Sequence, residues 1–218
     1  MKKDYTHIAF VLDRSGSMSS SKIETIKGFN SFLQEQQGLE GKATFTLVQF
    51  DDQYEVWHDF VDIQKVKKLK DKTYVPRGMT ALFDAIGKTI NIIGKKLSDL
   101  KEEERPEKVV FVILTDGQEN SSLEYRFEVI SDMIKHQTEK YNWTFVFLGS
   151  ELSAVDQAIN MGISSSNTLN YSADAEDVQI LYKSVSSSVS KLRMAKEAKM
   201  DFFSEDEKAS YRSKIQKK

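Results

Sequence analysis

Short apolar runs alternate with amphipathic patterns along most of the chain. Three of the runs are unbroken and rich in β-branched or aromatic residues, at residues 8–12, 109–114 and 144–148. Runs of this length and composition are typical of strands that are buried on both faces of a parallel sheet. Between residues 43 and 61, two more runs flank a short polar stretch and predict an antiparallel hairpin whose second strand forms the sheet edge. A sixth strand is expected at residues 167–171.

The polar and apolar positions between these strands repeat with the period of a helix. Five helices are expected, with apolar stripes at residues 23–33, 82–97, 127–134, 154–159 and 178–192. Ser21 and Ser121 each precede a glutamate by three residues, which is the spacing of a capping box and predicts that they begin the first and third helices. Strands that alternate with helices predict an α/β fold, with a doubly wound, mostly parallel six-stranded sheet, one antiparallel edge strand and helices on both faces.

A single domain accounts for most of the chain. The 218 residues are enough for one α/β domain with a core on both faces of its sheet. We place this domain at residues 1–198 and a charged C-terminal tail at residues 199–218. Ser204 and Glu207 have capping-box spacing and favour a short helix in the tail, and a frayed end is the alternative.

Charge and cysteine content narrow the classes of function. The formal net charge is -2, and basic residues are interleaved with acidic ones, so neither a nucleic acid nor a membrane surface is expected as a partner. The chain has no cysteine, which excludes disulfides, thiolate metal sites and cysteine nucleophiles. The first apolar run is too short for a secretory signal, and no later run approaches the length of a membrane span. The expected location is therefore cytoplasmic.

Side chains with carboxylate or hydroxyl oxygens occur where the predicted strands end and at the start of one predicted helix, and these positions lie at the same edge of the predicted sheet. Asp13, Ser15 and Ser17 follow the first strand. Asp116 follows the fourth strand, and Thr80 precedes a helix at the head of a loop that we expect to be exposed. Ligands of open parallel sheets bind outside the carboxyl ends of the strands. Two carboxylates and three hydroxyls, without histidine or cysteine, suit a hard cation such as Mg²⁺ or Mn²⁺, so these five residues are predicted to form a metal site.

Each of these residues also has an ordinary explanation. Serine and aspartate are common in loops and at helix N-caps, and Asp-x-Ser-x-Ser is a weak signal in a serine-rich chain. Their joint placement at matching strand ends favours the metal site. Glu119 and Asn120 follow closely, and either line the metal rim or belong to a solvated loop. Arg14 and Arg77 either steer an acidic partner or are ordinary surface residues.

The segments FVLDRSGSM (residues 10–18), GMTAL (78–82) and LTDG (114–117) resemble the three loops of the metal-ion-dependent adhesion site in von Willebrand factor type A domains. The resemblance extends in element order from about residue 5 to about residue 192. It implies a Rossmann-like fold with strand order 3-2-1-4-5-6. It also implies that the three hydroxyl residues bind the metal directly and that the two aspartates hold metal-bound waters. The chain resembles the small stand-alone members from bacteria and phages more than it resembles integrin inserted domains.

These features together predict a protein-binding module that is not an enzyme. A protein partner would present an Asp or Glu to complete the shell of the bound Mg²⁺ or Mn²⁺. The residues expected around that carboxylate form a mixed basic and apolar rim of Arg14, Met18, Arg77, Met79 and Gln118.

Two other functions are weighed against this one. The first is an adaptor subunit of an AAA+ ATPase system, which the resemblance to bacterial relatives allows. The second is a Mg²⁺-dependent phosphohydrolase with Asp13 as nucleophile. Such enzymes usually place a second aspartate two positions later, where this chain has Ser15, so the hydrolase is the less favoured alternative.

Overall fold

The computed structural model describes residues 1–172, 174–195 and 201–215. Its centre is one six-stranded sheet in the order β3-β2-β1-β4-β5-β6. Neighbouring strands are parallel except for the β2/β3 pair at one edge, which is antiparallel. The predicted sheet, its antiparallel edge strand and its strand order are therefore confirmed. The strands are β1 (Lys2–Asp13), β2 (Lys42–Phe50), β3 (Tyr54–Asp62), β4 (Pro106–Thr115), β5 (Thr144–Gly149) and β6 (Thr168–Asn170).

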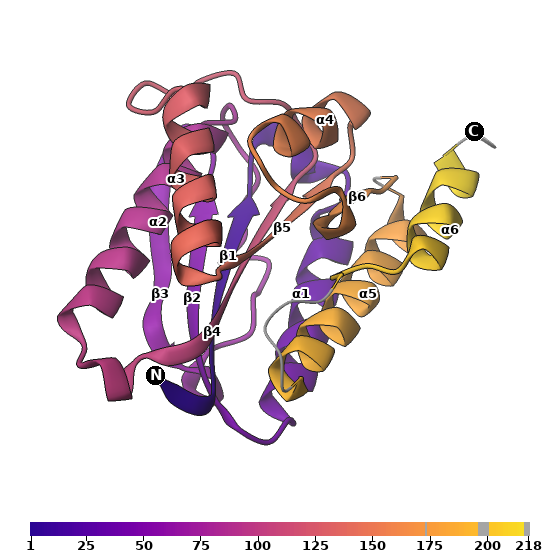
Figure 1. Ribbon diagram of the computed structural model, residues 1–218. Coiled ribbons are helices and arrows are strands. Elements are labelled where there is room, and N and C mark those ends of the chain that lie inside the picture. Colours follow the sequence, from indigo (N-terminus) through magenta and orange to yellow (C-terminus); the bar gives the residue numbers. More distant parts are fainter. Residues whose placement is uncertain (173, 196–200, 216–218) are drawn as a thin grey trace.

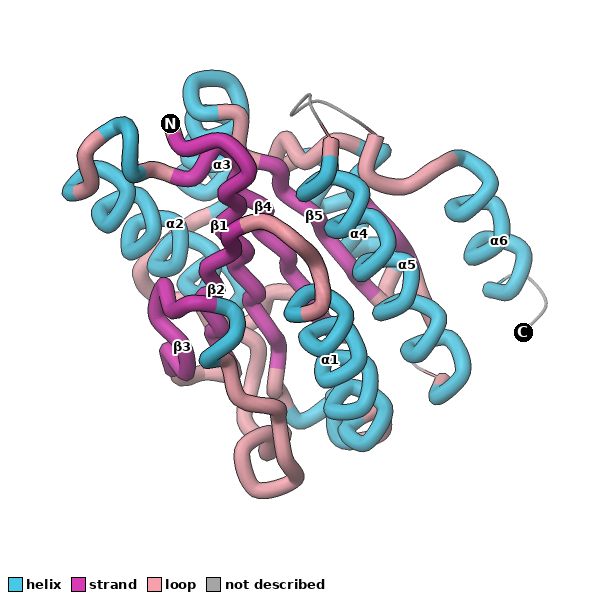
Figure 2. The backbone as a smooth tube through the Cα atoms, turned by 90° about the horizontal axis from the view of Figure 1, so that it is seen from below, coloured by secondary structure: helices cyan, strands magenta, loops and turns pink. Residues whose placement is uncertain are grey.

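Helices cover both faces of this sheet (Figure 1, Figure 2). On one face lie α1 (Lys22–Gln37) and α5 (Ala175–Met194). On the other lie α2 (Leu82–Asp99), α3 (Phe127–Tyr141) and α4 (Leu152–Asn160). A further helix, α6 (Glu205–Ile215), follows α5 and lies beside β6. This arrangement is the doubly wound α/β fold that the sequence predicts.

Strand β1 shows why its apolar run is unbroken. Ile8, Phe10 and Leu12 pack into the core beneath α1 and α5. Ala9 and Val11 pack into the core beneath α2 and α3. All five side chains are fully buried. A strand in the middle of a sheet that is covered on both faces needs apolar side chains at successive positions, so the first polar residues fall at the rim where the strand ends.

The C-terminal segment forms a capped helix that packs on the domain. The backbone N–H of Ser204 donates to Glu207 Oε2 at 2.8 Å, and the N–H of Glu207 donates to Ser204 Oγ at 3.2 Å. Phe202, Phe203 and Tyr211 are buried with the α1/α5 core. Of the two alternatives for this segment, the structure therefore has the helix. The boundary that we placed after residue 198 lies outside the described residues and stays a prediction.

Two predicted capping boxes do not form. Ser21 does precede α1, but its hydroxyl donates to a backbone carbonyl of the preceding turn and caps no helix N–H. Helix α3 begins well after Ser121, so the prediction that Ser121 begins it is wrong. The backbone N–H groups of residues 123–125 donate to the carboxylate of Asp84 in α2, at 3.0, 3.0 and 2.8 Å. These bonds hold the segment after Ser121 as a loop.

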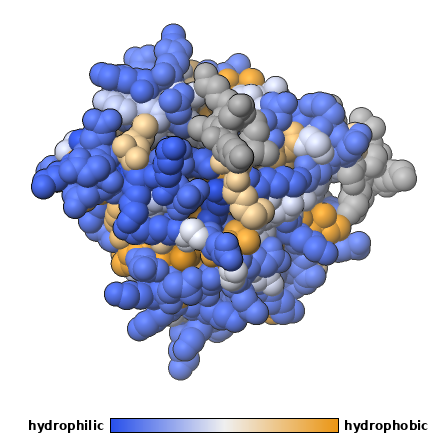
Figure 3. Space-filling view, turned by 60° about the horizontal axis from the view of Figure 1, so that its bottom comes forward, coloured by the Kyte–Doolittle hydropathy of each residue, from blue (hydrophilic) through white to orange (hydrophobic). Residues whose placement is uncertain are grey.

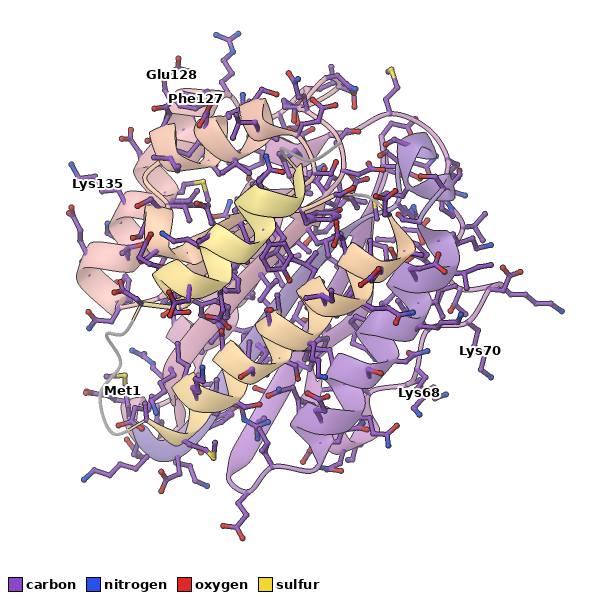
Figure 4. The ribbon with its side chains drawn as sticks, turned by 90° about the vertical axis from the view of Figure 1, so that its right-hand side faces the viewer. Met1, Lys68, Lys70, Phe127, Glu128 and Lys135 are labelled. Carbon is purple, nitrogen blue, oxygen red and sulfur yellow. The ribbon has the colours of Figure 1, made fainter. Side chains whose placement is uncertain are left out.

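The elongated sheet gives the molecule two distinct ends. Met1 lies at one end, whereas Phe127 and Glu128 mark the start of α3 at the other (Figure 4). The carboxyl ends of the parallel strands point to this second end, which is the top of Figure 1. The face that Figure 3 shows is largely hydrophilic, with small separate apolar patches. In the described ranges no helix has the length and apolar character that crossing a bilayer requires.

Candidate metal centre

The candidate metal centre lies at the carboxyl ends of β1 and β4, which are neighbours in the sheet (Figure 1). Because these strands are parallel, Asp13 at the end of β1 and Asp116 just after β4 reach the same rim. Ser15 and Ser17 follow β1 in a short 3-10 turn. Thr80 comes from the segment that leads into α2. The structure therefore brings the five predicted residues to one rim.

Hydrogen bonds link the two serines to one carboxylate. Ser15 Oγ and Ser17 Oγ lie 3.0 Å apart, and Ser17 Oγ donates to Asp116 Oδ1 at 2.5 Å. Gly117 leaves space beside these groups. A Cβ atom added to Gly117 would lie 3.5 Å from Thr80 Oγ1 and 3.8 Å from Ser17 Oγ. Hydroxyl groups from two separate segments therefore border a small polar space that a side chain at Gly117 would fill.

Asp13 is the most deeply buried member of the set, with no exposed surface. Its Oδ1 accepts a hydrogen bond from the N–H of Ser15 at 2.6 Å, and its Oδ2 accepts one from Thr115 Oγ1 at 2.6 Å. Burial raises the pKa of Asp13 to about 7, although these hydrogen bonds lower it. Burial also raises the pKa of Asp116, against the opposite effect of the Ser17 hydrogen bond.

The set of donors fits a divalent cation. Among the described residues, neither Asp13 nor Asp116 forms an ion pair with a basic side chain. The same part of the chain contains no cluster of three or more histidine, aspartate or glutamate residues that could hold a metal, so a cation at this rim depends on the hydroxyls as well. Oxygen donors without nitrogen or sulfur suit Mg²⁺ or Mn²⁺. A cation would also offset the cost of burying two carboxylates.

Asp51 connects the loops of the centre, and the sequence analysis missed it. This residue follows β2, is fully buried, and accepts at Oδ2 from Arg14 Nε at 3.1 Å and from Arg77 Nε at 2.8 Å. Its backbone carbonyl accepts from the N–H of Ala81 at 2.9 Å. Arg14 and Arg77 both pair with Glu55 as well, at 2.8 and 3.1 Å. The proposed steering of an acidic partner by these arginines is therefore not supported, because Arg14 is buried and both guanidinium groups are already paired.

Thr80 itself is buried, whereas residues 77–79, which lead to it, are exposed, as predicted for this loop. Its N–H donates to Asn120 Oδ1 at 2.8 Å, and the N–H of Asn120 donates to the Thr80 carbonyl at 3.0 Å. Glu119 accepts from the N–H of Phe83 at 2.8 Å and from that of Ser122 at 2.7 Å. Asn120 is exposed and Glu119 is partly exposed, as expected for a solvated loop, and both also tie the loop after β4 to the start of α2.

The expected rim is less basic than the sequence suggested. Met18 is fully buried in the α1/α5 core and does not reach the rim. Met79 is exposed, as expected. Gln118 is exposed and donates from Nε2 to Glu151 Oε2 at 2.6 Å and to Ser153 Oγ at 2.9 Å. With both arginines paired to carboxylates, Met79 and Gln118 are the exposed, uncharged members of the expected rim.

Two buried tyrosines donate hydrogen bonds to the backbone at the ends of β1 and β4. Tyr74 donates its hydroxyl to the backbone carbonyl of Asp13 at 2.6 Å. Tyr171 donates to the carbonyl of Thr115 at 3.4 Å. Both rings belong to the α1/α5 core and are almost completely buried. They satisfy backbone carbonyls at the points where β1 and β4 end, which fixes the positions of the two aspartates.

Comparisons with known proteins agree with this fold. The sequence profile of the von Willebrand factor type A domain matches residues 7–186. Inter-alpha-trypsin inhibitor heavy chain H3 of Homo sapiens is 26% identical over 135 residues, which cover 60% of this chain and 15% of that protein. The same protein of Pongo abelii gives the same values. The chain therefore spans only 15% of the length of these curated relatives.

Solved structures share the architecture at low sequence identity. Proximal thread matrix protein 1 from the mussel byssus matches with a TM-score of 0.56 and 19% identity, over 87% of this chain and 47% of that chain. A second structure of that protein, described as having a zinc-occupied MIDAS motif, matches with a TM-score of 0.55 and 19% identity over the same shares of the two chains. The D319A mutant of the PilB minor pilin from Streptococcus sanguinis has a TM-score of 0.59 and 12% identity, over 88% of this chain and 63% of that chain. At identities this low, the structural similarity shows that the fold is shared and shows nothing further.

Replacing Asp13 by asparagine is expected to change how stability depends on pH in metal-free protein. The folded-state pKa of Asp13 is about 7, above its ordinary 3.8. The stability that this group contributes is therefore complete below 3.8 and is lost as the pH rises through 7. For the wild type this loss is about 4 kcal/mol, and for Asp13→Asn it is absent. Urea unfolding in EDTA at acidic and alkaline pH measures the difference. Asp52→Asn, an exposed neighbour, is the control, and equal pH dependence in wild type and Asp13→Asn would contradict the prediction.

Replacing Asp51 by asparagine is expected to weaken the centre without removing a proposed ligand. Breaking a buried ion pair leaves uncompensated charge, so the free energy of unfolding should fall by about 3 kcal/mol. Because the loops lose their common anchor, the affinity for Mn²⁺ should fall by about tenfold or more, as measured by isothermal titration calorimetry. Asp71→Asn is the matched control, since Asp71 forms an exposed pair with Lys22 at 2.6 Å. A folded Asp51→Asn protein with wild-type Mn²⁺ affinity would show that the anchor has no such role.

Proposed function

This chain belongs to the von Willebrand factor type A domain family, and from that premise we propose that it is a metal-dependent protein-binding module. Domains of this family generally mediate metal-dependent protein interactions and are typically not enzymes. The observation that carries the proposal is the meeting of three hydroxyls and two carboxylates at one rim, where no basic side chain among the described residues pairs with the carboxylates.

The proposed ligands divide into neutral and charged groups. Ser15, Ser17 and Thr80 would bind Mg²⁺ or Mn²⁺ through their hydroxyl oxygens. Asp13 and Asp116 would supply negative charge from just outside these hydroxyls, which agrees with the hydrogen bonds that their oxygens already accept. The cation, when bound, supplies positive charge and an open coordination position. Since the hydroxyl ligands are neutral, that position favours an anionic group, and we propose the carboxylate of an Asp or Glu on a protein partner.

The environment of Asp13 supports binding over phosphate-ester hydrolysis. A nucleophilic aspartate needs a free oxygen that faces the substrate. Asp13 has no exposed surface, and each of its oxygens accepts a hydrogen bond at 2.6 Å. The position two residues later is Ser15, so the second carboxylate of such enzymes is missing. The proposed module therefore acts by capturing a partner.

Thr80 gives a clean test of the proposed function. Its Oγ1 forms no hydrogen bond with the described residues, whereas its backbone groups bond to Asn120 at 2.8 and 3.0 Å. Thr80→Ala therefore removes one proposed ligand and keeps the bonds that hold the loop. In pull-downs from the native host lysate with Mn²⁺, wild type is expected to retain specific partners that Thr80→Ala loses. Mass spectrometry of the retained proteins also shows whether an AAA+ ATPase is among them.

Thr80→Ser is the matched control, because it keeps the hydroxyl and should retain the partners. EDTA treatment of the wild type should release the same proteins. Circular dichroism establishes that all variants are folded. If wild type, Thr80→Ala and EDTA-treated protein all recover the same partners, the binding surface lies elsewhere, and the proposed metal-dependent binding is wrong.

A further inference from the structure

Large apolar side chains are exposed around the rim that carries the candidate metal centre. Of the exposed large hydrophobic residues in the described ranges, five lie in the first turn of helices that begin at this end or in the segments that lead into such helices. Their exposed fractions lie between 48% and 93%. They are Ile23, Val75, Met79, Leu123 and Leu152. Single exposed hydrophobic residues are common on protein surfaces, but several around one polar site mark an interaction surface.

Three of these residues are linked to the centre through neighbouring residues. Met79 immediately precedes Thr80. Leu123 donates its backbone N–H to Asp84 in the first turn of α2 at 3.0 Å. Leu152 lies between Glu151 and Ser153, which both accept hydrogen bonds from the side chain of Gln118. They therefore approach the centre from three different loops, and we call Met79, Leu123 and Leu152 the apolar rim. In Figure 1 the loop after β4 and the start of α4 lie together at the top.

The apolar rim is held in place by the structure. Asp84 accepts hydrogen bonds from three successive backbone N–H groups at residues 123–125. This fixes the backbone that presents Leu123, whose side chain is 93% exposed and contributes nothing to the core. A fixed backbone lowers the entropy cost of binding at such a residue. Leu123 is therefore already positioned for contact with a partner.

Three ion pairs involve basic side chains near this end. Lys22 pairs with Asp71 at 2.6 Å, and Lys88 pairs with Glu124 at 2.7 Å. Arg77 pairs with the buried Asp51 at 2.8 Å. Paired charges offer a partner little net attraction. The exposed apolar side chains therefore remain as contact groups at this end that compete with none of these ion pairs.

We propose that the partner presents its acidic residue within an apolar segment, with large aliphatic or aromatic side chains on both sides of a central Asp or Glu. These side chains would pack on Met79, Leu123 and Leu152 while the carboxylate takes the central position. The proposal rests on the proposed function, because it assumes that a carboxylate is captured at the centre. An apolar rim around one polar contact is the arrangement of a protein interface with a buried hot spot.

A peptide library tests this specificity. The probe is a phage-displayed library in which a central Asp or Glu is flanked by three random residues on each side, selected on immobilised protein in Mn²⁺. The wild type is expected to enrich large apolar residues next to the acidic position. The triple variant Met79→Ser/Leu123→Ser/Leu152→Ser should lose this enrichment and bind the best wild-type peptide at least about tenfold more weakly. Its Mn²⁺ affinity, measured by calorimetry, should stay at the wild-type value.

A matched triple variant removes exposed apolar residues that lie away from the rim. Tyr141→Ser/Ile159→Ser/Met194→Ser changes exposed positions at or near the C-terminal ends of α3, α4 and α5, and it should select the same peptides as the wild type. If the wild type enriches acidic peptides without any preference for the residues on either side, the proposed role of the apolar rim is wrong and the proposed function stands. Selection that is the same in EDTA, absence of Mn²⁺ binding, or no enriched peptide at all would instead overturn the proposed function.

Discussion

The burial of two carboxylates at the end of the sheet, without a basic partner among the described residues, is the constraint on which the rest of the structure depends. Asp13 ends a central strand that is covered on both faces, so the fold itself withdraws its side chain from water. Hydrogen bonds from Ser15 and Thr115 do not offset this burial, and the pKa of Asp13 is raised to about 7. Such a site needs either a proton or a cation. The neighbouring hydroxyls provide the uncharged oxygens that a hard cation takes as ligands.

The loops around these carboxylates are joined by contacts between distant parts of the chain. Asp51 bonds to both arginines that flank the centre, and Asn120 bonds to both backbone groups of Thr80. Asp84 and Glu119 connect the loop after β4 to the start of α2. These bonds set the positions of the hydroxyls independently of any bound ion. The proposed binding of a cation would then require little rearrangement of the backbone, which favours affinity.

Local patterns in the sequence predict the fold and the candidate ligands, because both depend on neighbouring residues. The apolar run of β1 ends directly before Asp13, so strand and ligand are found together. Asp51 also directly follows a strand, but no local pattern connects it with its partners Arg14 and Arg77, which lie 37 and 26 residues away. The capping-box spacing at Ser121 was misleading because Asp84, about 40 residues earlier, takes the N–H groups of the next turn. The burial of single residues between the regular elements was also not predictable, since Met18 in a short 3-10 helix and Thr80 before α2 are both buried.

Crystals of the protein soaked in Mn²⁺ give the most direct measurement of the central claim. Anomalous scattering from manganese locates the ion without reference to any assumed ligand. The account predicts one strong anomalous peak at the rim of β1 and β4, within bonding distance of the hydroxyl oxygens of Ser15, Ser17 and Thr80. It also predicts that this peak is lost from crystals of Asp13→Ala/Asp116→Ala. A peak elsewhere on the molecule, or a peak at the rim that survives this double substitution, would contradict it.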